Sequence, residues 1–407
     1  MKTIEKKHLL PFVLVTSLFA LWGLANNMTD TLLAAFRKIM QMSDTQTSFI
    51  QMAFYGAYFC VALPAALFIR KHSYKSGVIM GLVLYAAGAM LFLPAAEVES
   101  YAFYLIAIYV MAAGCSVLET TANPYIMSMG NAETATRRLN IAQSFNPIGS
   151  IMGIMVSKYF ILQDISLYSI SGTYAVLGGV LLAIMAVMLF ANMPDNSLEC
   201  SVESSESDSR HSTMSTINRL CHNRVYVWGV VAQFFYVGAQ IGAWSFTIRL
   251  VMKELGVAEA EAATIYLMSI IGFCLSRFVY TWMMRRIAPE SLLAAGAVLS
   301  AVSAMTVVMS SGWTAVVALV LVSVFMSLMF PTIYGIALGD VENPAKGGCE
   351  GDAKIGASGL IMAILGGALL TPLQGMVSDA AGTNISYMVP MGCFVVVLCY
   401  AFYAMKR

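Results

Sequence analysis

Long apolar stretches separated by short polar segments dominate this sequence and limit the folds that it can adopt. A helix of about 20 apolar residues is long enough to cross a bilayer, where every backbone polar group needs an internal hydrogen bond. Only 11% of the 407 residues are charged, against roughly 25% in soluble domains. We therefore expect an all-α protein that crosses a membrane many times.

The apolar stretches form twelve expected spans, six on each side of the longest hydrophilic segment. That segment is rich in Ser, Glu and Asp, which is typical of a flexible linker. We expect an N-terminal six-helix bundle at residues 1–193, a linker at 194–223 and a C-terminal six-helix bundle at 224–407. The expected spans cover approximately residues 10–36, 47–69, 75–96, 101–129, 139–163, 172–193, 225–252, 261–284, 291–310, 313–339, 355–379 and 385–404.

The two halves resemble each other weakly. A Phe-Cys pair occurs at Phe59-Cys60 and again at Phe273-Cys274, and Pro124 has a counterpart in Pro331. Such internal symmetry is typical of transporters built from repeated bundles, which bind substrate near the membrane midplane. We therefore expect the two bundles to be related by a pseudo-two-fold axis.

Basic residues indicate the orientation. Most Lys and Arg residues fall at the termini and in the loops that share a side with them, whereas the opposite loops hold only Arg37, Lys38 and Lys253, with Lys158 near a helix end. Because basic loops stay in the cytoplasm, both termini are predicted to be cytoplasmic.

Two carboxylates lie inside expected spans, Asp30 in the first and Glu119 in the fourth. A charged side chain at the centre of a membrane helix costs about 2.5–3.5 kcal/mol on insertion scales, so such residues usually face a polar interior and act there. No membrane-embedded Lys or Arg in the same half is available as a static partner. We therefore predict functional roles for both.

Amides and aromatic residues recur at helical spacing around these carboxylates. Residues three or four apart lie on one face of a helix, and such polar faces suit a shared aqueous cavity. The alternative is a set of hydrogen bonds across helix interfaces, or ordinary packing for the aromatic residues. The polar faces comprise Asn26, Asn27 and Asp30; Glu119 and Asn123; Asn140, Gln143 and Asn146; and Gln233, Tyr236, Gln240, Trp244 and Thr247.

Two arginines lie in expected spans of the C-terminal half. Arg249 is near the outer end of its span and is expected to extend toward the interface, whereas Arg277 is expected to brace a loop or a helix end. Glycine pairs at Gly149 and Gly153, and at Gly366-Gly367, predict close helix packing.

Several function classes receive no support from the motifs. The eight cysteines show no paired spacing, which argues against a disulfide framework and a zinc site. No Walker motif, Rossmann fingerprint or H-E-x-x-H motif occurs, which argues against an ATP-driven pump, an oxidoreductase and a zinc protease. We expect no enzyme activity, no cofactor and no metal.

Five blocks resemble the fucose permease branch of the major facilitator superfamily, within the fucose-galactose-glucose:proton symporter family. The N-N-x-x-D block at 26–30 and the L-E-T-x-A-N-P block at 118–124 are specific for that branch. The match covers both halves; its other blocks lie at 51–58, 138–146 and 330–338. The segment 339–354 departs from the family pattern, because it looks longer and more irregular than the usual loop.

The resemblance implies proton-coupled uptake of a monosaccharide by alternating access. It assigns the essential carboxylates to Asp30 and Glu119. From the charges we expect Asp30 to be the principal proton acceptor and Glu119 to hydrogen-bond the sugar. The expected substrate-binding residues are Asn26, Asn27, Glu119, Asn123, Gln143, Asn146, Gln240, Trp244, Phe273 and Tyr334.

L-Fucose is the expected sugar, in a cell inner-membrane protein that acts as a monomer and has no nucleic-acid partner. A glucose or galactose permease of the same family, or a sodium-coupled carrier, is the nearest alternative. A membrane-embedded enzyme that uses Asp30 and Glu119 as an acid and base pair is the rival from another class, since paired carboxylates hydrolyse glycosides. A sugar sensor is the third alternative, although no signalling domain is recognisable.

Overall fold

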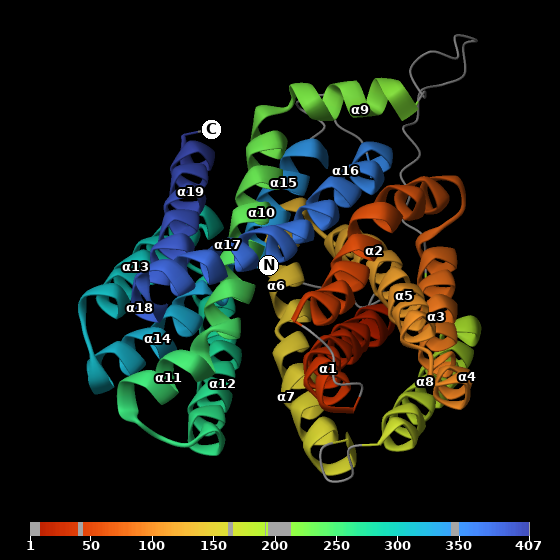
Figure 1. Cartoon of the computed structure of the whole chain (residues 1–407). Helices are drawn as coiled ribbons and strands as arrows, with labels where there is room; N and C mark the ends of the chain where they lie inside the picture. Colours follow the sequence, from red (N-terminus) through yellow and green to blue (C-terminus); the bar gives the residue numbers. More distant parts are fainter. Residues whose placement is uncertain are drawn as a thin grey trace, which may run out of the picture. The chain divides into compact units, whose positions relative to one another are not determined.

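The computed structural model describes residues 9–39, 44–161, 166–191, 193, 213–342 and 350–406, and within these ranges every regular element is a helix (Figure 1). The described residues form two compact units. Unit 1 takes residues 1–131, 148–205 and 350–362, and unit 2 takes residues 132–147, 206–349 and 363–407. The bundles expected at 1–193 and 224–407 follow the order of the chain and stay a prediction.

Unit 1 is built mainly from helices of the first half of the chain. Its described elements are α1 (Leu9–Ile39), α2 (Asp44–Lys71), α3 (Tyr74–Met90), α4 (Phe92–Val98), α5 (Tyr101–Ser128), most of α7 (Asn146–Val156), the π-helical turn η3 (Ser157–Ile161), α8 (Leu167–Phe190) and α16 (Glu350–Met362). Helix α16 packs against α2 and α5.

Unit 2 contains the rest. Its described elements are η2 (Ala132–Thr134), α6 (Ala135–Gln143), α9 (Thr213–His222), α10 (Arg224–Ser245), α11 (Thr247–Leu255), α12 (Glu259–Met283), α13 (Pro289–Met309), α14 (Gly312–Met326), α15 (Met329–Glu342), η5 (Ala363–Leu365), α17 (Gly366–Ala381), α18 (Thr383–Ser386) and α19 (Met388–Met405). Helix α6 packs against α12 and α15.

The helices account for the membrane-spanning pattern. Ten helical stretches in the described part of the chain are long and apolar enough to cross a membrane. The two other expected spans fall on α1 and on the series α6, α7 and η3. All twelve expected spans therefore lie on helices, which confirms an all-α multi-pass protein.

Several expected spans are interrupted. The span 139–163 breaks at Ser144-Phe145 between α6 and α7, and the span 313–339 breaks at Ser327-Leu328 between α14 and α15. A helix that stops leaves its last carbonyl groups without an intrahelical donor, so each break needs hydrogen-bond donors for its carbonyls from elsewhere.

The region expected as an irregular loop at 339–354 is partly helical. Helix α15 continues to Glu342 and α16 begins at Glu350, while residues 343–349 lie outside the described residues. Lys354 is buried in α16, with its Nζ 4.5 Å from the centroid of the Tyr74 ring. Its ammonium therefore packs on an aromatic face of unit 1, within a segment that the sequence had suggested to be an irregular loop.

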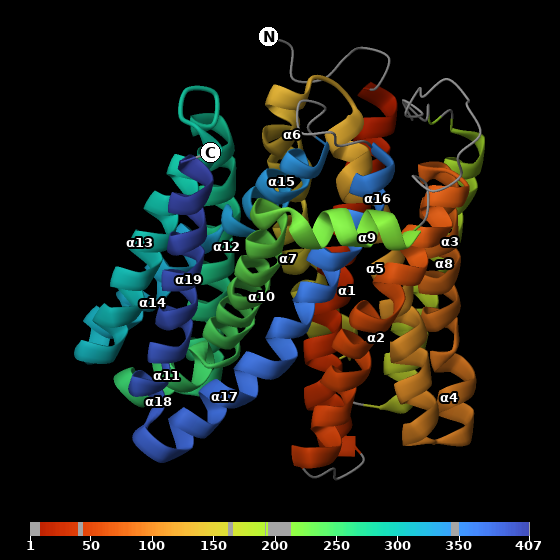
Figure 2. The same cartoon turned by 90° about the horizontal axis from the view of Figure 1, so that it is seen from above.

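Helix α9 leads into α10 at a sharp corner, and Figure 2 shows α9 running across the end of α10. Asn223 caps α10, because its Oδ1 accepts a hydrogen bond from the backbone N–H of Tyr226 at 3.1 Å. Its Nδ2 donates to Oδ2 of Asp340 on α15 at 2.9 Å. The same side chain therefore ends the predicted linker and fastens α10 to α15.

Close approach of α1 and α7 depends on two glycines. A Cβ atom at Gly149 would collide with the carbonyl oxygen of Ala20, and one at Gly153 would lie 2.6 Å from the carbonyl oxygen of Leu24. The expected close packing at these positions is confirmed. The pair Gly366-Gly367 behaves likewise, since Cβ atoms there would meet the Phe234 backbone and the Ile241 side chain.

Gly149→Ala is expected to lower the melting temperature of the purified protein in detergent. The new methyl group meets backbone, which cannot rotate away, and overpacking of this kind costs about 1–3 kcal/mol. The matched control is Gly179→Ala on α8, where a Cβ would meet no atom within 4 Å. Equal melting temperatures for Gly149→Ala and the control would contradict the close packing of α1 and α7.

Candidate functional site

Glu119, one of the two membrane carboxylates predicted from the sequence, lies on α5 in unit 1. The side chain is 4% exposed, and its Oε2 has no hydrogen-bond partner among the residues that the structure describes. Asn123, one turn further along α5, is fully buried. A buried carboxylate oxygen without a donor is costly unless it is protonated or meets a ligand, so Glu119 has the environment of a working residue.

A tyrosine near this carboxylate is hydrogen-bonded to a tryptophan of another helix. Nε1 of Trp22 on α1 donates a hydrogen bond to Oη of Tyr58 on α2 at 2.7 Å. The Tyr58 hydroxyl is within electrostatic range of both Cys115 and Glu119, which are one turn apart on α5. The cluster thus joins three helices around Glu119. The sequence analysis missed Trp22 and Tyr58, although an indole N–H in a membrane helix always needs an acceptor.

The polar face predicted on α1 is only partly described. Asn27 is half-buried, and its Nδ2 donates to the carbonyl oxygen of Gly23 at 3.1 Å. Asn26 and Asp30 lie within α1, but their side chains fall outside the described residues. The convergence of these three residues on one cavity therefore stays a prediction.

In unit 2 the structure brings two predicted aromatic residues together. Trp244 on α10 and Phe273 on α12 meet edge to face, with ring centroids 5.0 Å apart and an angle of 72° between the planes. The indole Nε1 donates to Oγ of Ser323 on α14 at 3.2 Å. Ser323 in turn accepts a hydrogen bond from Ser269 at 2.6 Å. The orientation of the indole ring is therefore fixed by α12 and α14.

Arg277 on α12 is 3% exposed and contacts Phe273 and two helix ends in the same part of unit 2. Its Nε donates to the carbonyl oxygen of Ser327 at 2.6 Å, and its Nη1 donates to the carbonyl oxygen of Gln143 at 2.9 Å. Ser327 is the C-cap of α14, and Gln143 is the last residue of α6. The prediction that Arg277 braces a helix end is confirmed.

The other predicted residues of unit 2 lie on separate helices. The Gln143 side chain is 4% exposed, whereas Asn146 and Gln240 are half-buried. Tyr334 on α15 is fully buried, and its ring is nearly parallel to that of Phe330, with centroids 6.5 Å apart. The geometry within unit 2 connects Gln143, Phe273 and Trp244, while Gln240 precedes Trp244 by one turn of α10.

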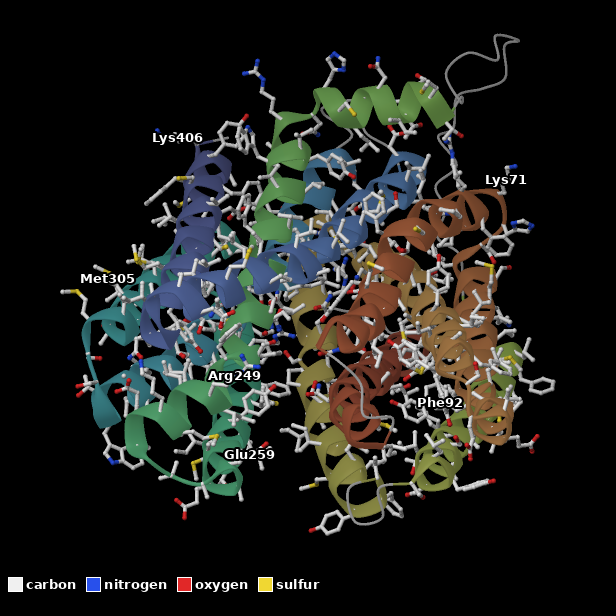
Figure 3. The ribbon with its side chains drawn as sticks, viewed as in Figure 1. Lys71, Phe92, Arg249, Glu259, Met305 and Lys406 are labelled. Atoms are coloured by element: carbon white, nitrogen blue, oxygen red, sulfur yellow. The ribbon has the colours of Figure 1, made fainter. Side chains whose placement is uncertain are left out.

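Arg249 lies on α11, the helix that follows α10. It is half-buried on α11, where Figure 3 labels it, and its guanidinium carbon is 5.5 Å from the centroid of the Phe246 ring. This stacking accounts for the burial of its stem. Among the described residues, no group of three or more His, Cys, Asp or Glu side chains could hold a metal ion.

The family model described as Major Facilitator Superfamily matches residues 14–347. The chain belongs to the major facilitator superfamily. It is 39% identical to the L-fucose-proton symporter of Haemophilus influenzae over 100% of this chain and 99% of the relative. It is also 29% identical to a glucose/galactose transporter of Brucella abortus over 99% of this chain and 96% of the relative.

A solved structure supports the same membership in the major facilitator superfamily. The crystal structure of a Major Facilitator Superfamily transporter, FucP, in the outward conformation matches with a TM-score of 0.86 and 33% sequence identity. The match covers 98% of this chain and 99% of that one. The major facilitator fold expected from the resemblance is thereby confirmed.

Proposed function

We propose that this protein is a secondary active transporter that carries L-fucose, or a closely related monosaccharide, into the cell together with protons by alternating access. The observation that carries the proposal is the end-to-end match to an L-fucose-proton symporter at 39% identity. The protein works as a monomer in the cell inner membrane with both termini in the cytoplasm, as the distribution of basic residues predicts.

Uptake of a neutral sugar against its concentration gradient requires coupling to an ion, because the sugar itself carries no charge. A carboxylate in a membrane interior can take up a proton near neutral pH and release it on the other side. Glu119 suits this task, since it is buried and no described residue forms a hydrogen bond with its Oε2. We assign the principal proton site to Asp30, and to Glu119 a hydrogen bond with the sugar that depends on its protonation.

The sugar is held by amides and aromatic rings. Gln143, Asn146 and Gln240, together with Asn26, Asn27 and Asn123, supply donors and acceptors for its hydroxyl groups. Trp244, Phe273 and Tyr334 supply apolar faces for the ring carbons. The edge-to-face pair formed by Trp244 and Phe273 favours this role, because its rings are held rigidly by Ser323 and Arg277.

A glucose or galactose carrier is the alternative, favoured by the full-length match to the Brucella transporter. We propose no enzyme activity for this protein, since its membership in the major facilitator superfamily supports transport. Sodium coupling would need oxygen ligands that hold the cation, and it is separated from proton coupling by the choice of gradient.

Uptake into proteoliposomes tests the proposal. Radiolabelled L-fucose, D-galactose, D-glucose and L-arabinose are offered in turn, with an alkaline interior, a sodium gradient or no gradient. We expect L-fucose to accumulate, and only with the alkaline interior. Preferred uptake of glucose or galactose would change the substrate, and dependence on sodium would contradict proton coupling. Chemical conversion of the sugar, checked by chromatography of the products, would favour an enzyme.

A further inference from the structure

Arg277 binds the two backbone carbonyl groups that lie four residues before two prolines of unit 2. In an α-helix the carbonyl of residue i accepts a hydrogen bond from the N–H of residue i+4. For Gln143 that residue is Pro147, and for Ser327 it is Pro331. Proline has no N–H, so both carbonyls lose their helical donors. Nη1 and Nε of Arg277 donate to these same two oxygens, at 2.9 and 2.6 Å.

The position of the Arg277 guanidinium between two helix ends also favours a positive charge. Helix α6 ends at Gln143, and α14 ends with Ser327 as its C-cap. The C-terminus of a helix carries a partial negative charge, so two such ends favour a cation between them. Arginine meets both, because its planar fork holds several donors at fixed directions, whereas lysine offers one compact ammonium group.

The same guanidinium group connects predicted sugar-binding residues. Its central carbon is 4.6 Å from the centroid of the Phe273 ring, and Phe273 meets Trp244 edge to face. Gln143 is held through its own carbonyl oxygen. Arg277 thus contacts Phe273 and Gln143 directly and reaches Trp244 through one ring.

We propose that Arg277 is a positioning residue for the sugar site: it holds the proline breaks of α6 and α14 against α12, and so sets the placement of Gln143, Phe273 and Trp244. This inference rests on the proposed function, since it takes these three residues as sugar ligands. It differs from simple stabilisation, because a stabilising brace would leave the sugar affinity of the folded protein unchanged.

The first test measures the dissociation constant of L-fucose by titration calorimetry on the full-length protein in detergent. Arg277→Gln is expected to raise it about tenfold, which corresponds to about 1.4 kcal/mol, with Arg277→Lys in between. The matched control is Lys75→Gln. Nζ of Lys75 donates to the carbonyl oxygens of Leu189 and Ala191 at the end of α8, so it also caps a helix C-terminus, but it forms no hydrogen bond with any predicted sugar ligand whose side chain the structure describes. The control is expected to lose thermal stability and to keep its affinity.

The second test uses the proline itself. Pro147→Ala restores an N–H that can donate to the Gln143 carbonyl and replace Arg277 there. In the Arg277→Gln background, Pro147→Ala is therefore expected to recover part of the lost affinity, so that the two changes are not additive. If Arg277→Gln does not yield folded protein, Arg277→Lys takes its place in the same comparison.

The outcomes separate the inference from the proposed function. Normal fucose binding by the wild type, with an affinity of the folded Arg277 variants within about twofold of it, would overturn the positioning role. Strictly additive effects of the arginine and proline changes would overturn it as well. A wild-type protein that binds none of the four sugars would overturn both the inference and the proposed function.

Discussion

Asp30→Asn is expected to abolish uphill accumulation of the sugar while leaving sugar exchange across the membrane intact. A pH gradient of about two units supplies about 2.7 kcal/mol per proton, enough for about 100-fold accumulation at one proton per sugar. Asparagine has a similar shape and polarity but cannot take up the proton. The inside-to-outside ratio of labelled fucose should therefore fall to about one at any imposed gradient.

Proteoliposomes with an alkaline interior provide the measurement, and counterflow against unlabelled fucose reports exchange. Asp379→Asn is the matched control, because Asp379 lies exposed on α17. It should accumulate sugar as the wild type does. Full accumulation by Asp30→Asn would remove Asp30 from the proton path, and loss of both accumulation and counterflow would indicate a role in sugar binding.

Glu119→Gln is expected to weaken sugar binding and accumulation together. The buried carboxylate can accept a hydrogen bond from a sugar hydroxyl, and hydrogen bonds to charged groups contribute about 1.5–3 kcal/mol. An amide accepts more weakly, and its NH₂ group would add donors to a buried cluster that already holds the Tyr58 hydroxyl. We therefore expect the dissociation constant of fucose to rise about 10- to 100-fold.

Calorimetric titration of the detergent-solubilised protein measures this change, and uptake at saturating sugar measures the coupling that remains. Glu97→Gln serves as the control, since Glu97 is exposed at the end of α4. An unchanged fucose affinity in Glu119→Gln would exclude Glu119 from the sugar site. A loss of affinity combined with intact accumulation at saturating sugar would confine Glu119 to binding.

Most of the fold could be predicted because the membrane imposes it. Apolar length determines where helices form, and all twelve expected spans lie on helices. The helix breaks were harder to predict from the sequence, since hydropathy is continuous through Ser144-Phe145 and Ser327-Leu328. Pro147 and Pro331 are the local signals, but proline in a membrane helix is often tolerated without a break, so spacing alone does not decide.

The candidate site was predictable to the extent that its members are unusual in a membrane. Glu119 stands out in an apolar run, and the structure places it in a buried environment. The hydrogen bond from Trp22 to Tyr58 joins residues 36 positions apart, and neither is unusual by itself in a membrane helix. The contacts of Arg277 have the same origin, because they depend on which helix ends lie beside α12. Periodicity within one helix carries no information about such neighbours.

The division of the chain into units also determines how many covalent connections join the two units. Following the sequence, the chain passes from one compact unit to the other after residues 131, 147, 205, 349 and 362. The linker expected at 194–223 is therefore only one of five connections. Two of the others fall beside helix interruptions, at Pro147 near the start of α7 and between α16 and η5. Cutting or lengthening the chain at 194–223 would therefore leave the four other covalent connections between the units unchanged.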